Sequence, residues 1–215
     1  MNKALFSIVS LFLATLSVTP LAAAPVKGME ANVLVLPDRF HSRIQPRIYH
    51  ALMTEAAKAT PPLKLNFVAF NPFMSNRIGE SEDEQKQIMD LLNKSVAEVV
   101  DIKKRHPETT MLLAHILEYM KKHPDSNLAQ VRKRIDTFMK RYHFLVVESS
   151  DTFGIHPMFY TSGETRIKTP EGASKADIIE AIYGLFFVDA ALKQKKLIWG
   201  TCHGAQFGYV HAGGR

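Results

Sequence analysis

The sequence predicts a three-layer α/β domain in which helices cover a parallel β-sheet, and three observations lead to this prediction. Short apolar runs, typical of strands buried on both faces, alternate with longer segments of helical periodicity. A strand, a helix and a second strand follow one another within residues 31–70, as in a parallel βαβ unit. The last apolar run leads into a cysteine between two glycines, and a helical segment follows. This order predicts one α/β domain.

The N-terminal segment has a different composition from the rest of the chain. Lys3 precedes an almost unbroken apolar run over residues 4–18, and small residues suited to cleavage follow at 20–24. This pattern predicts a secretory signal peptide over residues 1–24, and therefore a periplasmic or secreted protein. The apolar run is shorter than the roughly 20 residues that cross a bilayer, so we expect no stable membrane span after cleavage. The full chain is 46% hydrophobic, and the remaining residues, 25–215, suffice for one well-cored domain.

The first strand and helix are delimited by prolines. Residues 31–37 form a continuous apolar run that ends at Pro37, and a helix is predicted from Pro46 to about residue 60. Residues 63–70 form the second apolar run and complete the predicted βαβ unit.

Three predicted helices then interrupt the alternation of strands and helices. A capping box at residues 81–84 begins the first, which ends near 107; the others cover about 107–121 and 125–142. We interpret residues 81–142 as a helical insertion. Residues 101–142 carry ten Lys or Arg against five Asp or Glu, which indicates solvated helix faces or, as the less favoured alternative, a contact surface for acidic lipid or an acidic partner. Aromatic residues do not alternate there with the basic residues as in a nucleic-acid-binding platform, so we expect no nucleic-acid partner.

The alternation resumes at residues 143–148, a third strand. Ser174 and Asp177 are predicted to cap a long helix that ends near residue 193, and a fourth strand begins at Leu197. The sequence contains no phosphate-binding glycine loop, so no cofactor is predicted. His115 and Glu118 share a helix face but lack a second histidine at zinc-binding spacing, so no metal site is predicted.

The fourth strand enters the sequence Gly200-Thr201-Cys202-His203-Gly204, which is typical of a nucleophile elbow: a strand, one strained residue and a helix. We expect glycines at 200 and 204 because the turn brings neighbouring backbones too close for a Cβ. At the helix N-terminus, the backbone N–H groups and helix dipole favour thiolate over thiol, and the N–H of His203 faces a developing oxyanion. The alternative is that Cys202 is a small buried hydrophobic residue.

These residues resemble the nucleophile motif of class I glutamine amidotransferases, G-x-C-x-G-x-Q followed by Gly-Gly, here ending at Gln206 and at residues 213–214. Upstream, Ser150-Asp151 and residues 156–160 are similar to the G-G-x-D-[IV]-x-P-x-x-Y segment of the γ-glutamyl-hydrolase-like branch, the C26 peptidases. Serines replace that branch's Gly-Gly, and two additional residues precede the proline. Asp177 and Glu180 occupy the helix before the nucleophile, where the branch often has acidic residues.

The resemblance implies a flavodoxin-like sheet and thioester chemistry on glutamine or a γ-glutamyl amide, a small-molecule substrate, without a cofactor. Cys202 is then the nucleophile, the backbones of His203 and Ser150 form the oxyanion hole, and Gln206 and His156 lie on the substrate side. In the family, the catalytic histidine and its orienting glutamate form a later H-x-E motif. Arg215 comes nine residues after Gln206, before such a motif. We therefore expect either an exported cysteine hydrolase whose domain is incomplete at its C-terminus or a catalytically inactive remnant or binding module, and the sequence does not predict the oligomeric state.

Overall fold

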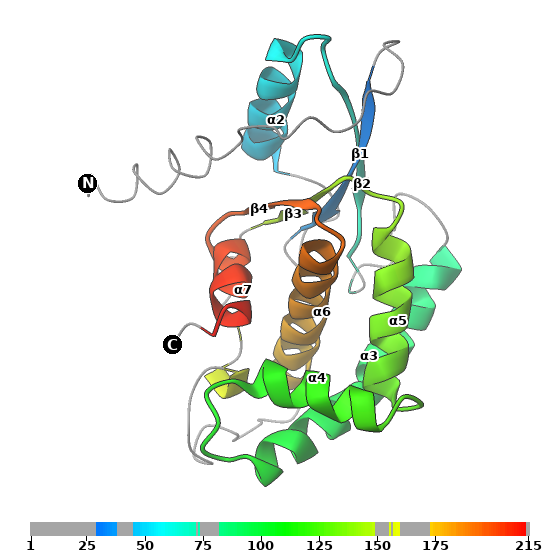
Figure 1. Ribbon diagram of the computed structural model, residues 1–215, viewed down its shortest axis with the longest axis vertical. Helices are drawn as coiled ribbons and strands as arrows, with labels where there is room; N and C mark the ends of the chain where they lie inside the picture. The colour runs from blue at the N-terminus through cyan, green and yellow to red at the C-terminus, as the bar shows by residue number, and fades with distance from the viewer. Residues whose placement is uncertain are drawn as a thin grey trace, which may run out of the picture.

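The computed structural model describes residues 29–37, 45–71, 73, 82–148, 155, 157–159 and 173–213. These residues form four strands, six α-helices and one short 3-10 helix, arranged around a single sheet (Figure 1). The predicted signal peptide lies outside the described residues.

The four strands are all parallel. They are β1 (Glu30–Leu36), β2 (Lys64–Ala69), β3 (Phe144–Val147) and β4 (Leu197–Gly200), in the order β2-β1-β3-β4. Val33 of β1 pairs with Phe67 of β2 on one side and with Phe144 of β3 on the other. The α/β class and parallel sheet predicted from the sequence are confirmed, and the strand order is compatible with the doubly wound order 2-1-3-4-5 of flavodoxin-like folds.

One face of the sheet carries helix α2 (Pro46–Lys58) (Figure 1). Pro46 begins the helix, because its fixed φ suits the first turn and its missing N–H leaves no donor unpaired there. Ile48 is buried in a small cluster with Val33, Val35 and Val146 of the sheet. Through this cluster, the helix of the βαβ unit packs against both β1 and β3.

The opposite face is covered by α3 (Glu82–Arg105), α5 (Asn127–Met139), α6 (Ala173–Lys193) and α7 (His203–His211). In Figure 1, α6 lies between α5 and α7, and α4 (Leu112–Lys122) crosses the far end of this layer. Every residue of α6 from 178 to 191 is buried, so α6 is the central helix of the core. The rings of Phe70, Phe138 and Phe187 pack together with centroids 5.1–6.0 Å apart.

The helix boundaries differ from prediction at two places. Helix α4 begins at Leu112 rather than near residue 107, because residues 106–109 form turns after α3. The prediction that Ser174 caps α6 is wrong, because Ala173 is already helical and Ser174 is therefore inside the first turn. The predicted capping serine of α3, Ser81, lies outside the described residues.

The basic charge of residues 101–142 is not all solvated. Most of its Lys and Arg side chains are exposed, as predicted, but Lys103 is fully buried and Arg132 is 6% exposed. Both side chains hydrogen-bond inside the helical layer, Lys103 to the carbonyl of Thr109 and Arg132 to Asp136 and Asp189. Among the helices that the structure describes, none combines the length and apolarity needed to cross a bilayer.

Candidate functional site

Cys202 lies between the end of β4 and the first residue of α7, as the sequence predicts. Its backbone has φ +48° and ψ −109°, and its side chain is exposed. A positive φ is uncommon for a residue other than glycine, and such strain of about 1–3 kcal/mol persists only where neighbouring structure enforces it. The thiol therefore stands at the carboxyl end of a parallel strand in a conformation that favours glycine.

Two glycines make this turn sterically feasible. A Cβ on Gly200 would lie 2.7 Å from the carbonyl carbon and oxygen of Gly204, and a Cβ on Gly204 would overlap the backbone carbonyl of Val147. The same Val147 oxygen accepts a hydrogen bond from the N–H of Thr201, at 3.1 Å. The first turn of α7 is thus pressed against the ends of β3 and β4, which is the reason the sequence needs small residues on both sides of Cys202.

The residues after Cys202 begin α7 and face a second segment of the chain. His203 is the first residue of the helix. Gln206 is exposed, and its Oε1 accepts a hydrogen bond of 3.4 Å from the backbone N–H of Ile155. Ile155 lies two residues before η1 (Pro157–Phe159), so Gln206 joins α7 to the segment in which the sequence predicts substrate contacts. Ser150 and His156 themselves lie outside the described residues.

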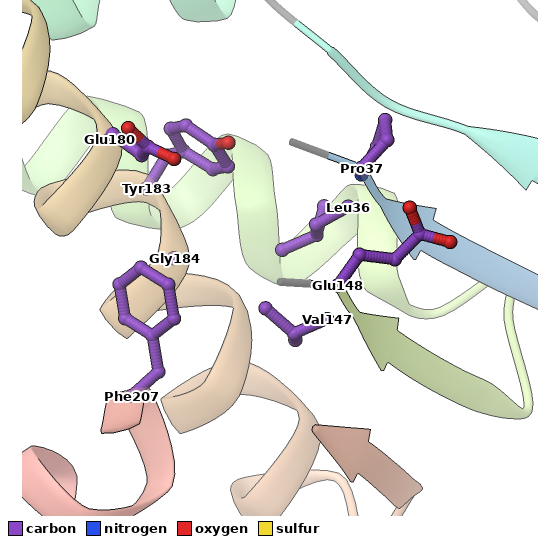
Figure 2. A pocket seen from close by; sticks show the side chains of 8 residues that line it. All are labelled: Leu36, Pro37, Val147, Glu148, Glu180, Tyr183, Gly184 and Phe207. Carbon is purple, nitrogen blue, oxygen red and sulfur yellow. The ribbon is translucent and has the colours of Figure 1, made fainter. Parts of the chain in front are cut away.

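A small cavity lies at the carboxyl ends of β1 and β3, next to helices α6 and α7. Because the chain passes from β1 to β2 on one side and later to β3 on the other, this is the point where the strand order reverses, the usual ligand position in open α/β sheets. Figure 2 shows the eight lining residues: Leu36, Pro37, Val147, Glu148, Glu180, Tyr183, Gly184 and Phe207. The space among them is about 10 Å³, close to the smallest cavity that holds one water molecule.

The two carboxylates of the cavity have different surroundings. Glu148, 3% exposed, accepts a 2.7 Å hydrogen bond from the N–H of Gln45, the residue that caps α2. A carboxylate at a helix N-terminus is stabilised by the helix dipole. Glu180, 5% exposed, lies beside Tyr183 on α6 and on the other side of the cavity from Glu148 (Figure 2). The sequence indicated Glu180 through the family resemblance, but it gave no signal for Glu148 beyond its position at a strand end.

Two histidines that the sequence places near the ends of these elements, His211 and His143, are engaged away from Cys202. The imidazole Nε2 of His211, nine residues further along α7, lies 2.9 Å from Asp189 Oδ1. His143 receives the N–H of Asn32 on its Nδ1, at the starts of β3 and β1 and hence at the opposite edge of the sheet from the strand ends.

Asp189 is the centre of a buried ionic network that was not predicted from the sequence. Its carboxylate contacts Arg132 of α5, Lys193 at 2.9 Å and His211 at 2.9 Å, and Arg132 also pairs with Asp136 at 2.8 Å. Burial acts to raise the pKa of Asp189, but hydrogen bonds from His211 and Lys193 and the charge of Arg132 outweigh it and hold that pKa well below its ordinary value. The network ties α7 to α6 and α5. The only sign of this network in the sequence is an aspartate within the apolar run of α6.

The described part of the chain contains no group of three His, Cys, Asp or Glu side chains arranged to hold a metal ion. Comparisons of the chain with protein-family models, with curated proteins and with solved structures find no match.

Proposed function

We propose that the protein is an exported cysteine-dependent hydrolase that cleaves the side-chain amide of glutamine or of a γ-glutamyl compound through a thioester. In the first step the Cys202 thiolate forms a bond to the amide carbonyl carbon, and the C–N bond breaks as ammonia or an amine leaves with a proton. Water then adds to the thioester, releases the carboxylic acid and returns the thiol.

The observation that carries this proposal is the conformation of Cys202. An exposed thiol is held at positive φ between a parallel strand and a helix N-terminus, and two glycines remove the side chains that would forbid the turn. This arrangement supports the interpretation as a nucleophile elbow, in which the N–H of His203 would donate to the oxyanion. Gln206, at the fourth position after the cysteine, links α7 to the segment beside the predicted substrate pocket.

The alternative is a catalytically inactive remnant or binding module with the same fold, and one observation favours it. His211, the other histidine of α7, is bound to Asp189 rather than directed at Cys202. A thiol without a base binds and reacts with electrophiles, but losing one member of a catalytic triad costs several orders of magnitude in turnover.

An electrophilic analogue of glutamine tests whether Cys202 lies in a glutamine-binding site, as both the hydrolase and a glutamine-binding module require. We expect a γ-glutamyl chloromethyl ketone to alkylate Cys202 with saturating kinetics at pH 7.5, and L-glutamine, unlike L-asparagine, to slow the reaction. Mass spectrometry of the labelled peptide measures the rate. Cys202→Ala abolishes labelling, whereas the matched control Tyr209→Phe, an exposed position on α7, labels normally. Labelling no faster than by iodoacetamide, without protection by glutamine, contradicts a glutamine site.

Turnover separates the hydrolase from the remnant. Because His211 is bound to Asp189 and His143 lies at the opposite edge of the sheet, neither can act as the base for Cys202, and we expect the 215-residue chain to release ammonia from glutamine no faster than background. A longer form that includes a downstream H-x-E motif should turn over glutamine and lose that activity in Cys202→Ala. If the longer form labels at Cys202 but shows no turnover, the protein is the binding module. Rapid Cys202-dependent turnover by the 215-residue chain requires a base within it, and His156 is then the first residue to substitute.

A further inference from the structure

The turn that joins α3 to α4 places titratable side chains in unusually close contact. We call residues 103–115 the α3–α4 corner. The imidazole rings of His106 and His115 are stacked, with centroids 3.9 Å apart and planes inclined by 14°. Beneath them Lys103 is fully buried, and its Nζ donates a 2.7 Å hydrogen bond to the carbonyl of Thr109. The corner thus packs three basic groups where α3 ends and α4 begins.

One carboxylate of α4 opposes these basic groups, and it is already engaged elsewhere. Glu118 lies one turn after His115 and pairs with Lys122 at 2.7 Å in an exposed ion pair. Burial lowers the pKa of Lys103, and the negative charge of Glu108, in the turn itself, opposes that effect. The charged side chains of α5 are Arg132 and Asp136, which pair with each other, and the exposed Lys133 and Arg134. The sequence of η1, Pro-Met-Phe, has no titratable side chain.

The α3–α4 corner adjoins the elements that surround Cys202. The methyl group of Met111 lies 3.4 Å from the position that a Cβ on Gly213 would occupy, just beyond the end of α7. Helix α4 also contacts η1, and Ile155, two residues before η1, donates to Gln206 of α7. A change in the position of α4 therefore reaches both the end of α7 and the segment that Gln206 holds.

We propose that the α3–α4 corner is an acid-sensitive joint, in which protonation of His115 against the stacked ring of His106 and the buried Lys103 loosens α4 from its neighbours. Two imidazolium rings face to face repel each other, and the ammonium of Lys103 adds a third positive charge. Histidine side chains ordinarily acquire their charge between pH 5 and 8, the range in which the joint would respond. This inference does not depend on the chemistry at Cys202.

The direction of the pH effect follows from the surroundings of His115. Burial lowers the pKa of His115, and the charges of His106 and Lys103 lower it further, against the opposing effect of Glu118. A histidine released from the corner therefore binds a proton more readily than one held in it. The stabilisation from the closed corner is present above the ordinary value of about 6.5 and is lost as the pH falls below it. For one histidine, linkage limits the loss to about tenfold in the opening equilibrium per pH unit.

Hydrogen exchange tests the joint in the full chain. We expect the protection factors of backbone amides in α4, corrected for the intrinsic effect of pH on exchange, to fall up to about tenfold between pH 7.0 and 5.5, while those of α6 stay unchanged. His115→Gln, which keeps a polar side chain but cannot be protonated, should make the protection of α4 equal at the two pH values. His106→Gln should reduce the fall, and because His106 is exposed this second variant is expected to fold.

His50→Gln is the matched control, since His50 is an exposed histidine of α2 on the other face of the sheet. It should leave the pH response of α4 as in the unmodified protein. Equal protection of α4 at pH 7.0 and 5.5 in the unmodified protein overturns the proposal. So does a fall that persists in both His115→Gln and His106→Gln, because the titrating group then lies elsewhere. The first result requires no variant, so the test remains decisive if His115→Gln does not fold.

Discussion

Cys202 has an exposed thiol and a strained backbone, and both result from the turn between β4 and α7. The turn from β4 into α7 requires φ +48° at the position where the chain presents a thiol, although glycine would adopt that conformation at no steric cost. The chain thus has a side chain at a position that disfavours one, and strain of this kind is concentrated at functional sites.

Replacing Cys202 tests the strain directly. We expect Cys202→Gly to be more stable than Cys202→Ala, by about 1 kcal/mol in the free energy of unfolding, because both remove the thiol and only glycine relieves the positive φ. Urea denaturation of the two variants measures the difference. Equal stabilities would mean that the turn is not strained in solution.

The position of Cys202 in a turn between two glycines was predictable, because a strand, a turn and a helix follow one another there in the sequence, although the Val147 carbonyl that Gly204 approaches is distant in the sequence. The network at Asp189 and the stacked pair of His106 and His115 were not predicted. Asp189 meets Arg132 across 57 residues, and the two histidines meet only because of how the turn between two helices closes. Periodicity locates a residue on a face of its own helix, but it does not identify what faces it from another.

Helix α6 shows how one element can position several others. It is buried along most of its length, and at Gly184 it is approached so closely by the ring of Phe207 that a Cβ would overlap the ring. Asp189, one and a half turns further on, receives Arg132 from α5 and His211 from α7. A close steric contact and an ionic contact thus hold α7 against α6 at two points.

Asp189→Asn should destabilise the protein by about 3 kcal/mol or more at pH 7, because it leaves the buried charge of Arg132 without its closest partner. The pKa of Asp189 is lowered in the folded state, so its contribution is present above its ordinary value of 3.8 and is lost as the pH falls below it. The variant should therefore lose less stability than the unmodified protein between pH 5 and pH 3. Denaturant titrations at the three pH values measure this.

Asp136→Asn is the matched control, because Asp136 also pairs with Arg132 but its side chain is 39% exposed. Its effect at pH 7 should be well below that of Asp189→Asn, since solvent compensates an exposed partner. If the two substitutions lower the free energy of unfolding equally, burial does not strengthen the contribution of the ion pair between Asp189 and Arg132.

The elements themselves were largely predictable. All four strands and all six described helices have a counterpart in the sequence analysis, because apolar runs and helical periodicity are local signals. The start of α4 and the cap of α6 were misplaced, since a boundary depends on turn geometry that periodicity does not encode. Three helices lie within residues 82–139 as expected, and their status as an insertion is an interpretation.

The helices on the α6 side of the sheet share one continuous core, although the sequence suggested an α/β unit with added helices. Buried side chains of α3, α4 and α5 join those of α6, α7 and the sheet in a single cluster, which includes Leu34, Ile116 and Phe207. A helical segment that contributes to the main core cannot unfold without exposing the sheet. The molecule is therefore expected to behave as one cooperative unit.

The single tryptophan provides the test of cooperativity. Trp199 lies on β4 and is 38% exposed, so its fluorescence reports on the sheet, whereas circular dichroism at 222 nm reports mainly on the helices. We expect the two denaturant transitions to coincide. Loss of the helical signal at a lower denaturant concentration than the tryptophan signal would identify the α3–α5 segment as a separate folding unit. Trp199→Phe, with an unchanged circular dichroism transition, would show that the probe residue does not itself set the midpoint.

The pairing of β1 with both β2 and β3 has a consequence for synthesis on the ribosome. β2 follows β1 closely, but the contact between Asn32 and His143 at the start of β3 spans 111 residues. At typical elongation rates, about 5–20 s pass between the appearance of β1 and of β3. For that interval β1 lacks its β3 neighbour, and its unpaired backbone N–H and C=O groups form the kind of edge that other strands join. Chaperone binding to the nascent chain should therefore be strongest before β3 emerges.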